Sequence, residues 1–195
     1  MKPNARKLST LAAGLTALFC LSFAPPRAAA QAEGSSGEAK TVAAFEARAK
    51  EYSRLREGLE EKLPKLPKEA TPEQISAHKE TFQGMVRSAR AEAKHGDVFS
   101  EDIAAVIRVM IKREYSGEQL QELRKTVMEA ETQGVPLRIN YPYPESKELL
   151  EMPPTLLLKL PQLPKQLRYR FVGTNLLLVD RENGLIVDYM TSALP

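Results

Sequence analysis

Few residues in this sequence have the types and spacing that chemistry requires. There is one cysteine, Cys20, and there are two histidines, His78 and His95, which stand 17 positions apart. A zinc site usually takes four ligands from Cys, His and carboxylates, and this spacing defines no such set. The sequence also lacks the Gly-x-Ser-x-Gly turn of many serine hydrolases and a Gly-rich phosphate loop. We therefore predict no catalytic residues, no metal ligands and no cofactor.

The first thirty residues have the pattern of a secretory signal peptide. Basic residues up to Lys7 precede an uncharged run over 8–24 rich in Leu, Ala and Phe, and three alanines at 28–30 follow. This order is typical of a cleaved signal. We predict a signal peptide at 1–30 with cleavage after Ala30, or alternatively after Ala32. An uncleaved anchor is the other interpretation, but the run is shorter than the roughly 20 apolar residues that span a bilayer. The predicted location is periplasmic or secreted.

Removal of this segment changes the charge and the chemistry of the chain. The segment holds four of the 28 basic residues and the only cysteine, so 24 basic residues remain against 25 acidic ones, a net charge of −1. A near-neutral chain gives no support to a nucleic-acid or anionic-membrane partner. Without a cysteine it has no disulfide and no thiolate ligand. The predicted partner is a protein or an envelope component, with no nucleic acid and no membrane span.

Residues 41–134 are predicted to form four amphipathic helices. Apolar residues recur there at three- and four-residue steps. Thr71–Gln74 and Ser116–Gln119 have the pattern of capping boxes, and Gly96 and Gly134 are expected helix ends. Short connections favour an antiparallel bundle or two helical hairpins. The small polar residues 31–40 are predicted to be a flexible lead-in.

Each histidine has an expected structural role in this helical region. His78 falls on an apolar helix face, where a packed and hydrogen-bonded core histidine is expected. His95 is expected in the last turn of the second helix, where a cation interacts favourably with the helix dipole.

Residues 135–195 are predicted to be a proline-rich connection followed by an antiparallel β-meander. Strands are expected at 167–171, 176–179 and 185–189, with an Asn-Gly hairpin turn at 183–184. A fourth strand at 137–141 and a helical turn at 155–160 are also expected. The predicted fold class is α+β, with the helices and the meander packed as one domain because an isolated meander needs a helix to cover its apolar face.

The alternation within the strands predicts two faces. Leu167, Tyr169 and Phe171 are expected on one face together with Leu185, Val187 and Tyr189. Charged residues on the opposite face are expected to pair across strands. If the helices leave that opposite face uncovered, it is a candidate interaction patch, formed by Arg168, Arg170, Leu177, Val179, Ile186 and Asp188.

The sequence resembles three known families. The phrases YRFVG, LLLVD and NGLIVDYM in the tail, with FEARAKEYSRLREGLEEKLPKLP and AKHGDVF earlier, resemble a family of uncharacterised exported bacterial proteins, which brings no established activity. The tail loosely resembles the C-terminal hairpin of periplasmic nickel/cobalt-homeostasis proteins. The Thr71–Gln74 and Ser116–Gln119 motifs resemble the Leu-Thr-x-x-Gln repeats of periplasmic stress chaperones, although Ala70 and Tyr115 stand where those have Leu.

The leading functional hypothesis is an exported, non-catalytic protein that binds another protein or an envelope component. It follows from an export signal combined with an ordinary core and no reactive group of side chains. A periplasmic chaperone or metal-stress protein is the first alternative, and a small hydrolase is the least supported.

Overall fold

The computed structural model describes residues 27–130, 134–147 and 150–194. Most of the predicted signal peptide, up to residue 26, lies outside them. Five helices and three strands form an α+β fold, as predicted. In chain order they are α1 (Arg27–Glu60), α2 (Pro72–Ala89), α3 (Glu101–Glu114), α4 (Gly117–Glu129), α5 (Pro154–Leu157), β1 (Leu167–Val172), β2 (Asn175–Asp180) and β3 (Ile186–Met190).

The three strands form an antiparallel meander in the order β1-β2-β3. Gly173 and Gly184 adopt positive φ angles of 55° and 67° at the two turns, a conformation that glycine adopts without steric penalty. The strand bounds agree with the predicted ones to within a residue or two. The expected fourth strand at 137–141 does not form. That segment instead runs beside β3, where the N–H of Asn140 donates to the Ile186 carbonyl at 2.8 Å.

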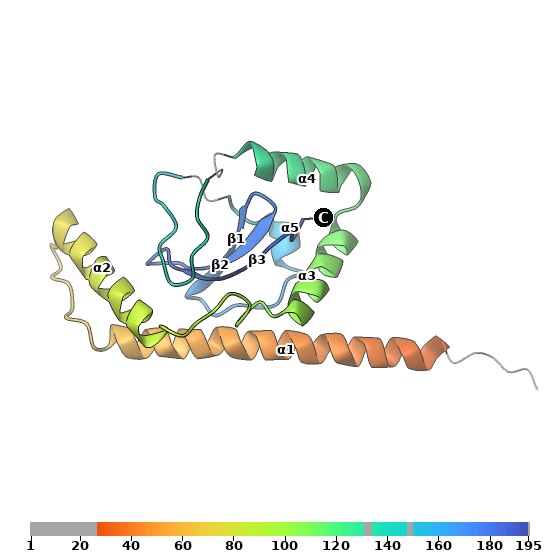
Figure 1. Cartoon of the computed structure of the whole chain (residues 1–195), viewed down its shortest axis with the longest axis horizontal. Helices are drawn as coiled ribbons and strands as arrows, with labels where there is room; N and C mark the ends of the chain where they lie inside the picture. Colours follow the sequence, from red (N-terminus) through yellow and green to blue (C-terminus); the bar gives the residue numbers. More distant parts are fainter. Residues whose placement is uncertain (1–26, 131–133, 148–149, 195) are drawn as a thin grey trace, which may run out of the picture.

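The helices surround the sheet and do not form a bundle of their own. Figure 1 shows α1 running along one side of the molecule, with α2 at one end and α3 and α4 at the other, and the sheet between them. The largest apolar cluster lies between the sheet and α1, α2 and α3. At its centre the ring of Phe45 stacks on Phe99 and on Tyr169, with centroid distances of 5.3 and 6.4 Å. The helices therefore cover the sheet face that required burial.

A β-bulge in β3 changes the predicted assignment of faces. Leu178 pairs with Asp188, but the next residue, Val179, pairs with Ile186, so β3 carries one extra residue. An extra residue reverses which face the following side chains take. Val187 lies in the helix-covered cluster, as expected, but Tyr189 packs on the opposite face. Asp188, expected among the arginines, lies on the helix side.

Asp188 holds the loop before α3 against the sheet. Its carboxylate is fully buried and accepts hydrogen bonds from four backbone N–H groups, those of Gly96, Val98, Phe99 and Tyr189, at 2.7–3.1 Å. A buried carboxylate with this many donors is well satisfied without a basic partner.

Two helix bounds differ from the sequence prediction. The second helix was expected to reach Gly96, but α2 ends at Ala89. There the side-chain amide of Asn140 donates to the Arg90 carbonyl at 2.9 Å, a tertiary contact that replaces the next helical turn. The predicted flexible lead-in 31–40 is part of α1, because adding residues to an existing helix costs far less than starting one.

The two predicted capping boxes have different outcomes. At Thr71 the reciprocal hydrogen bonds with Gln74 are present. Ser116 precedes α4, but its hydroxyl makes no capping hydrogen bond. The expected helical turn at 155–160 is present as α5.

Replacement of Asp188 tests its role in the fold. Asp188→Ala is expected to lower the free energy of unfolding by about 3 kcal/mol, since it leaves several buried N–H groups without an acceptor. Urea denaturation measures this. Asp102→Ala, at an exposed acid in the first turn of α3, is the control and is expected to cost about 0.5 kcal/mol. Equal effects of the two variants would contradict the assignment.

Candidate functional site

Strand β1 places two arginines on one side of an edge strand. Leu167, Tyr169 and Phe171 point into the helix-covered core, so alternation directs Arg168 and Arg170 to the other side. In the antiparallel register these two residues pair with Val179 and Leu177 of β2. Because β1 is the edge strand of the sheet, the arginines lie at its margin, beside the segment in which Leu150 forms an isolated bridge with Phe171.

Two more basic residues lie at the start of β1. Arg181 follows β2, and its Nε donates to the Leu167 carbonyl at 3.1 Å. Its backbone N–H donates to the Gln166 carbonyl at 2.8 Å. Lys165 precedes β1 and is exposed. The hairpin thus brings together residues that are 16 positions apart, Lys165 and Arg181.

These four basic residues line one cleft, which we call the arginine cleft. It has a volume of about 590 Å³ and runs between the edge of β1 and the segment 151–165. Glu151 is the one acidic residue that lines it. Its side chain is 87% exposed, and its oxygen lies 3.3 Å from the Nη2 of Arg170. An exposed ion pair of this kind contributes little energy, so the positive charge of the cleft is largely uncompensated.

The arginines of the cleft repel one another. Burial lowers the pKa of Arg170, and the neighbouring charge of Arg168 lowers it further. The charge of Glu151 opposes this, and the charge of Arg181 adds a smaller lowering effect. The Nε of Arg168 is buried and, among the described residues, is the one buried side-chain polar atom without a hydrogen-bond partner. Such a group costs about 1–3 kcal/mol. An anion in the cleft would relieve both costs.

The cleft also has an apolar margin on α5. Leu157 and Leu158 line it, and their residues are 49% and 84% exposed. The turn that carries them begins after Pro153 and Pro154, which fix its backbone. Chemically, the site is a pocket for an anionic group with an apolar surface at its entrance.

The predicted interaction patch is divided by the structure. Leu177, Val179 and Ile186 are at most 1% exposed, because Tyr143, Val135 and Leu137 of the segment 134–143 pack over them. Asp188 is buried on the helix side. Only Arg168 and Arg170 of the six lie in a cleft. Sequence analysis missed Lys165, Arg181, Leu157 and Leu158. The run Leu156-Leu157-Leu158-Lys159, which lies between two Pro-rich positions, was the one feature of the sequence that could have indicated exposed leucines there.

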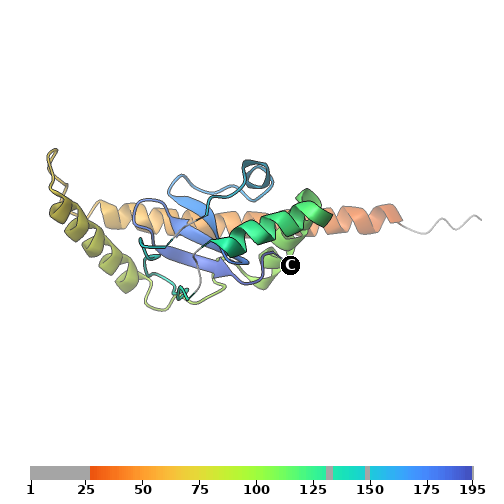
Figure 2. The ribbon, with the colours of Figure 1, turned by 90° about the horizontal axis from the view of Figure 1, so that it is seen from above.

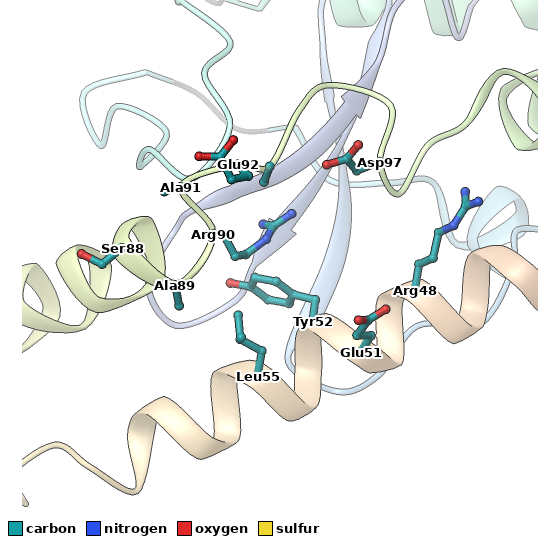
Figure 3. A pocket seen from close by; sticks show the side chains of 11 residues that line it. Arg48, Glu51, Tyr52, Leu55, Ser88, Ala89, Arg90, Ala91, Glu92 and Asp97 are labelled. Carbon is teal, nitrogen blue, oxygen red and sulfur yellow. The ribbon is translucent and has the colours of Figure 1, made fainter.

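A second pocket, of about 490 Å³, lies between α1 and the segment after α2. Figure 3 shows Tyr52 and Arg90 at its centre, with the guanidinium 5.1 Å from the centre of the ring. The Tyr52 hydroxyl donates to Asp180 at 3.0 Å. Arg90 donates to the Asn140 side chain at 2.6 Å and to the Val187 carbonyl. These polar groups are already bonded to the protein, which distinguishes them from the Nε of Arg168 in the arginine cleft.

Both histidines lie away from the arginine cleft. The Nε2 of His78 is 3.1 Å from the Pro64 carbonyl; the residue is hydrogen-bonded as expected, but it is half-exposed and not part of the core. His95 follows the end of α2, so it is not in the last helical turn, and its ring lies 4.3 Å from that of Tyr189. Within the described part of the chain, no three His, Cys, Asp or Glu side chains are grouped as metal ligands would be.

The comparisons with known proteins identify no relative. Neither the protein-family models, nor the curated proteins, nor the solved structures give a match to this chain. The functional argument therefore rests on the chemistry of the sites described above.

The buried tyrosines predict a loss of stability at alkaline pH. Burial, followed by the charge of Asp180, raises the pKa of Tyr52 well above its ordinary value, and burial also raises the pKa of Tyr169. Unfolded tyrosines lose a proton near pH 10. Above about pH 10 the unfolded state therefore binds fewer protons than the folded state, and stability falls as pH rises.

Tyr52→Phe and Tyr169→Phe test this expectation. In each variant the free energy of unfolding should fall less steeply with rising pH, because one raised tyrosine pKa no longer contributes to the fall. Urea denaturation between about pH 8 and 11 measures this. At neutral pH each loses one hydrogen bond, worth about 1 kcal/mol. Ultraviolet titration of the folded protein, which has six tyrosines, should show Tyr52 and Tyr169 still un-ionised well above about pH 10, because their pKa values are raised. Ionisation of all six together near pH 10 would contradict the assignment.

Proposed function

We propose that this chain is an exported, non-enzymatic protein that binds an anionic group of an envelope component in the arginine cleft. The observation that carries the proposal is the buried Nε of Arg168, which has no partner and belongs to a cleft lined by three further basic residues. Guanidinium groups match the planar, two-oxygen geometry of phosphates and carboxylates.

The contrast between the arginine cleft and the pocket around Tyr52 supports binding at the cleft. Around Tyr52 the polar atoms complete bonds within the protein. In the cleft the Nε of Arg168 has no partner, although Arg170 pairs with the exposed Glu151 and donates to the Tyr169 carbonyl at 2.9 Å. Polar groups left unsatisfied by the fold are those that a ligand stabilises most, because binding removes a cost that the free protein bears.

A non-enzymatic role is supported by the placement of the residues that could react. A general base must lie within hydrogen-bond reach of the proton that it takes. Neither histidine lines the cleft, and its one carboxylate, Glu151, extends into solvent. The basic residues there are suited to holding an anion in place.

Export is tested by the N-terminus of the protein isolated from its cells. We expect the mature chain to begin at Gln31, since the small-residue run at 28–30 is the predicted cleavage site. Mass spectrometry of the N-terminal peptide measures this. Leu15→Arg, which breaks the apolar run, should leave the full-length chain in the cytoplasm. A full-length wild-type chain in the cytoplasm would contradict the proposal of export.

Anion binding is tested with Arg168→Gln and inorganic phosphate as the probe. Phosphate should raise the melting temperature of the wild-type protein, as any ligand of the folded state does, and shift the amide signals of residues 165–170 and 181. Arg168→Gln is expected to reduce phosphate affinity about tenfold, the typical loss for one charge-assisted hydrogen-bonding group.

The stability of the same variant gives an independent measure. Because Arg168 has a buried unpartnered atom and like-charged neighbours, Arg168→Gln is not expected to lower the free energy of unfolding without phosphate. Lys112→Gln on α3 is the charge-matched control and should leave phosphate binding unchanged. Wild-type binding by Arg168→Gln would contradict the placement of the site.

A further inference from the structure

The exposed leucines at the arginine cleft are unlike the other exposed apolar residues of the described chain. Ile75, Val109 and Met128 are 43–50% exposed, but each belongs to a different helix. Leu157 and Leu158 are adjacent in sequence, and Leu158, at 84%, is the most exposed large apolar residue described. Scattered apolar residues are normal on protein surfaces, whereas a group at the mouth of a polar pocket indicates a binding surface.

The segment that carries these leucines projects from the molecule. In Figure 2, α5 and its flanking residues stand out beyond the sheet, while the Thr155 hydroxyl of α5 lies 2.8 Å from the hydroxyl of Tyr115 at the end of α3. Lys159 follows the leucines and is exposed. Lys165 and the three arginines line the same cleft as the leucines, so exposed apolar side chains and cations lie next to each other on this surface.

We infer that the α5 projection and the arginine cleft together form a docking surface for an anionic lipid bilayer. Leu157 and Leu158 enter the interfacial region of the bilayer, and the cleft holds a lipid phosphate. This inference rests on the proposed function, because it names the source of the anionic group. It is a peripheral contact: no helix in the described ranges has the length and apolar character to cross a bilayer.

The exposure of the two leucines favours a bilayer over an acidic protein segment. A protein segment binds most tightly in a groove that buries its apolar side chains, whereas Leu157 and Leu158 are 49% and 84% exposed at the margin of the cleft. Exposed apolar residues beside a group of cations match the two layers of a membrane interface, in which acyl chains lie beneath charged headgroups.

The two kinds of contact should contribute comparably to affinity. A cation close to an anionic surface contributes about fivefold to affinity. A leucine transferred into the interface contributes about tenfold. Neither contribution alone gives firm attachment, so we expect binding that is reversible and that weakens as salt screens the headgroup charge.

Vesicle sedimentation of the mature chain tests the inference. The chain is expected to sediment with vesicles of phosphatidylglycerol and phosphatidylcholine, and not with vesicles of phosphatidylcholine alone. Leu157→Ser/Leu158→Ser should lower vesicle affinity at least tenfold and should lower the affinity for inorganic phosphate far less, because the leucine side chains offer phosphate no donor. Arg168→Gln should lower both. Ile75→Ser/Val109→Ser is the matched control, because it removes similarly exposed apolar side chains from α2 and α3, and it should bind as the wild type does.

The outcomes separate this inference from the proposed function. Phosphate binding without vesicle binding would overturn the lipid inference and leave the anion site intact. Absence of both would overturn both. Binding to soluble poly-glutamate that equals vesicle binding, and that the leucine replacements do not alter, would overturn the lipid inference in favour of an acidic protein partner.

Discussion

The buried ion pair between Arg56 and Asp180 is the interaction on which the architecture depends. Asp180 is fully buried at the end of β2, and its Oδ2 accepts from the Nε of Arg56 at 2.9 Å and from the Tyr52 hydroxyl. Its Oδ1 accepts from the backbone N–H groups of Glu182 and Asn183. One carboxylate thus connects α1 with the turn between β2 and β3. Loss of one partner would leave an uncompensated buried charge, which is far more costly than the pair itself is stabilising.

This pair also determines where positive charge remains available. Arg56 is satisfied by Asp180, Glu60 and Glu182, and Arg90 is satisfied by Asn140 and the Val187 carbonyl. The turn that Asp180 organises places Arg181 beside β1, where its Nε donates to the Leu167 carbonyl. The chain beyond residue 30 is close to neutral overall, with 24 basic and 25 acidic residues, yet its basic residues are not evenly neutralised. Net charge argued against an anionic partner, whereas the local distribution of charge favours one.

The strands were predictable because their signals are local. Alternation of apolar residues and the Asn183-Gly184 turn depend on a few neighbouring positions, and they fixed three strands to within two residues. The bulge at Val187 was not predictable, since it depends on how Asp188 reaches the loop before α3. The early end of α2 likewise depends on Asn140, which is 50 positions from Arg90. Patterns within one helix do not reveal such distant partners.

Only the part of the candidate site that lies on β1 was predictable, because alternation within a strand is a local signal. Alternation placed Arg168 and Arg170 together on the face opposite the helices. It could not show that the segment 134–143 covers Leu177, Val179 and Ile186, because that segment has no regular pattern and its packing is tertiary. Nor could alternation within the strands show that Arg181 and α5 lie at the edge of β1. The apolar part of the predicted patch is therefore core, and the exposed apolar residues beside the arginines come from α5.

The unsatisfied Arg168 has a cost that the fold could avoid. A glutamine or serine at this edge position would lower the repulsion with Arg170 and Arg181, and would remove a buried donor without a partner. Groups that reduce stability in the free protein are a frequent property of binding sites, because the ligand supplies the missing interaction. The cleft differs in this respect from the Asp180 and Asp188 sites, where every charge is compensated within the chain. That difference, more than the size of the pocket, distinguishes a surface built for a ligand from one built for the fold.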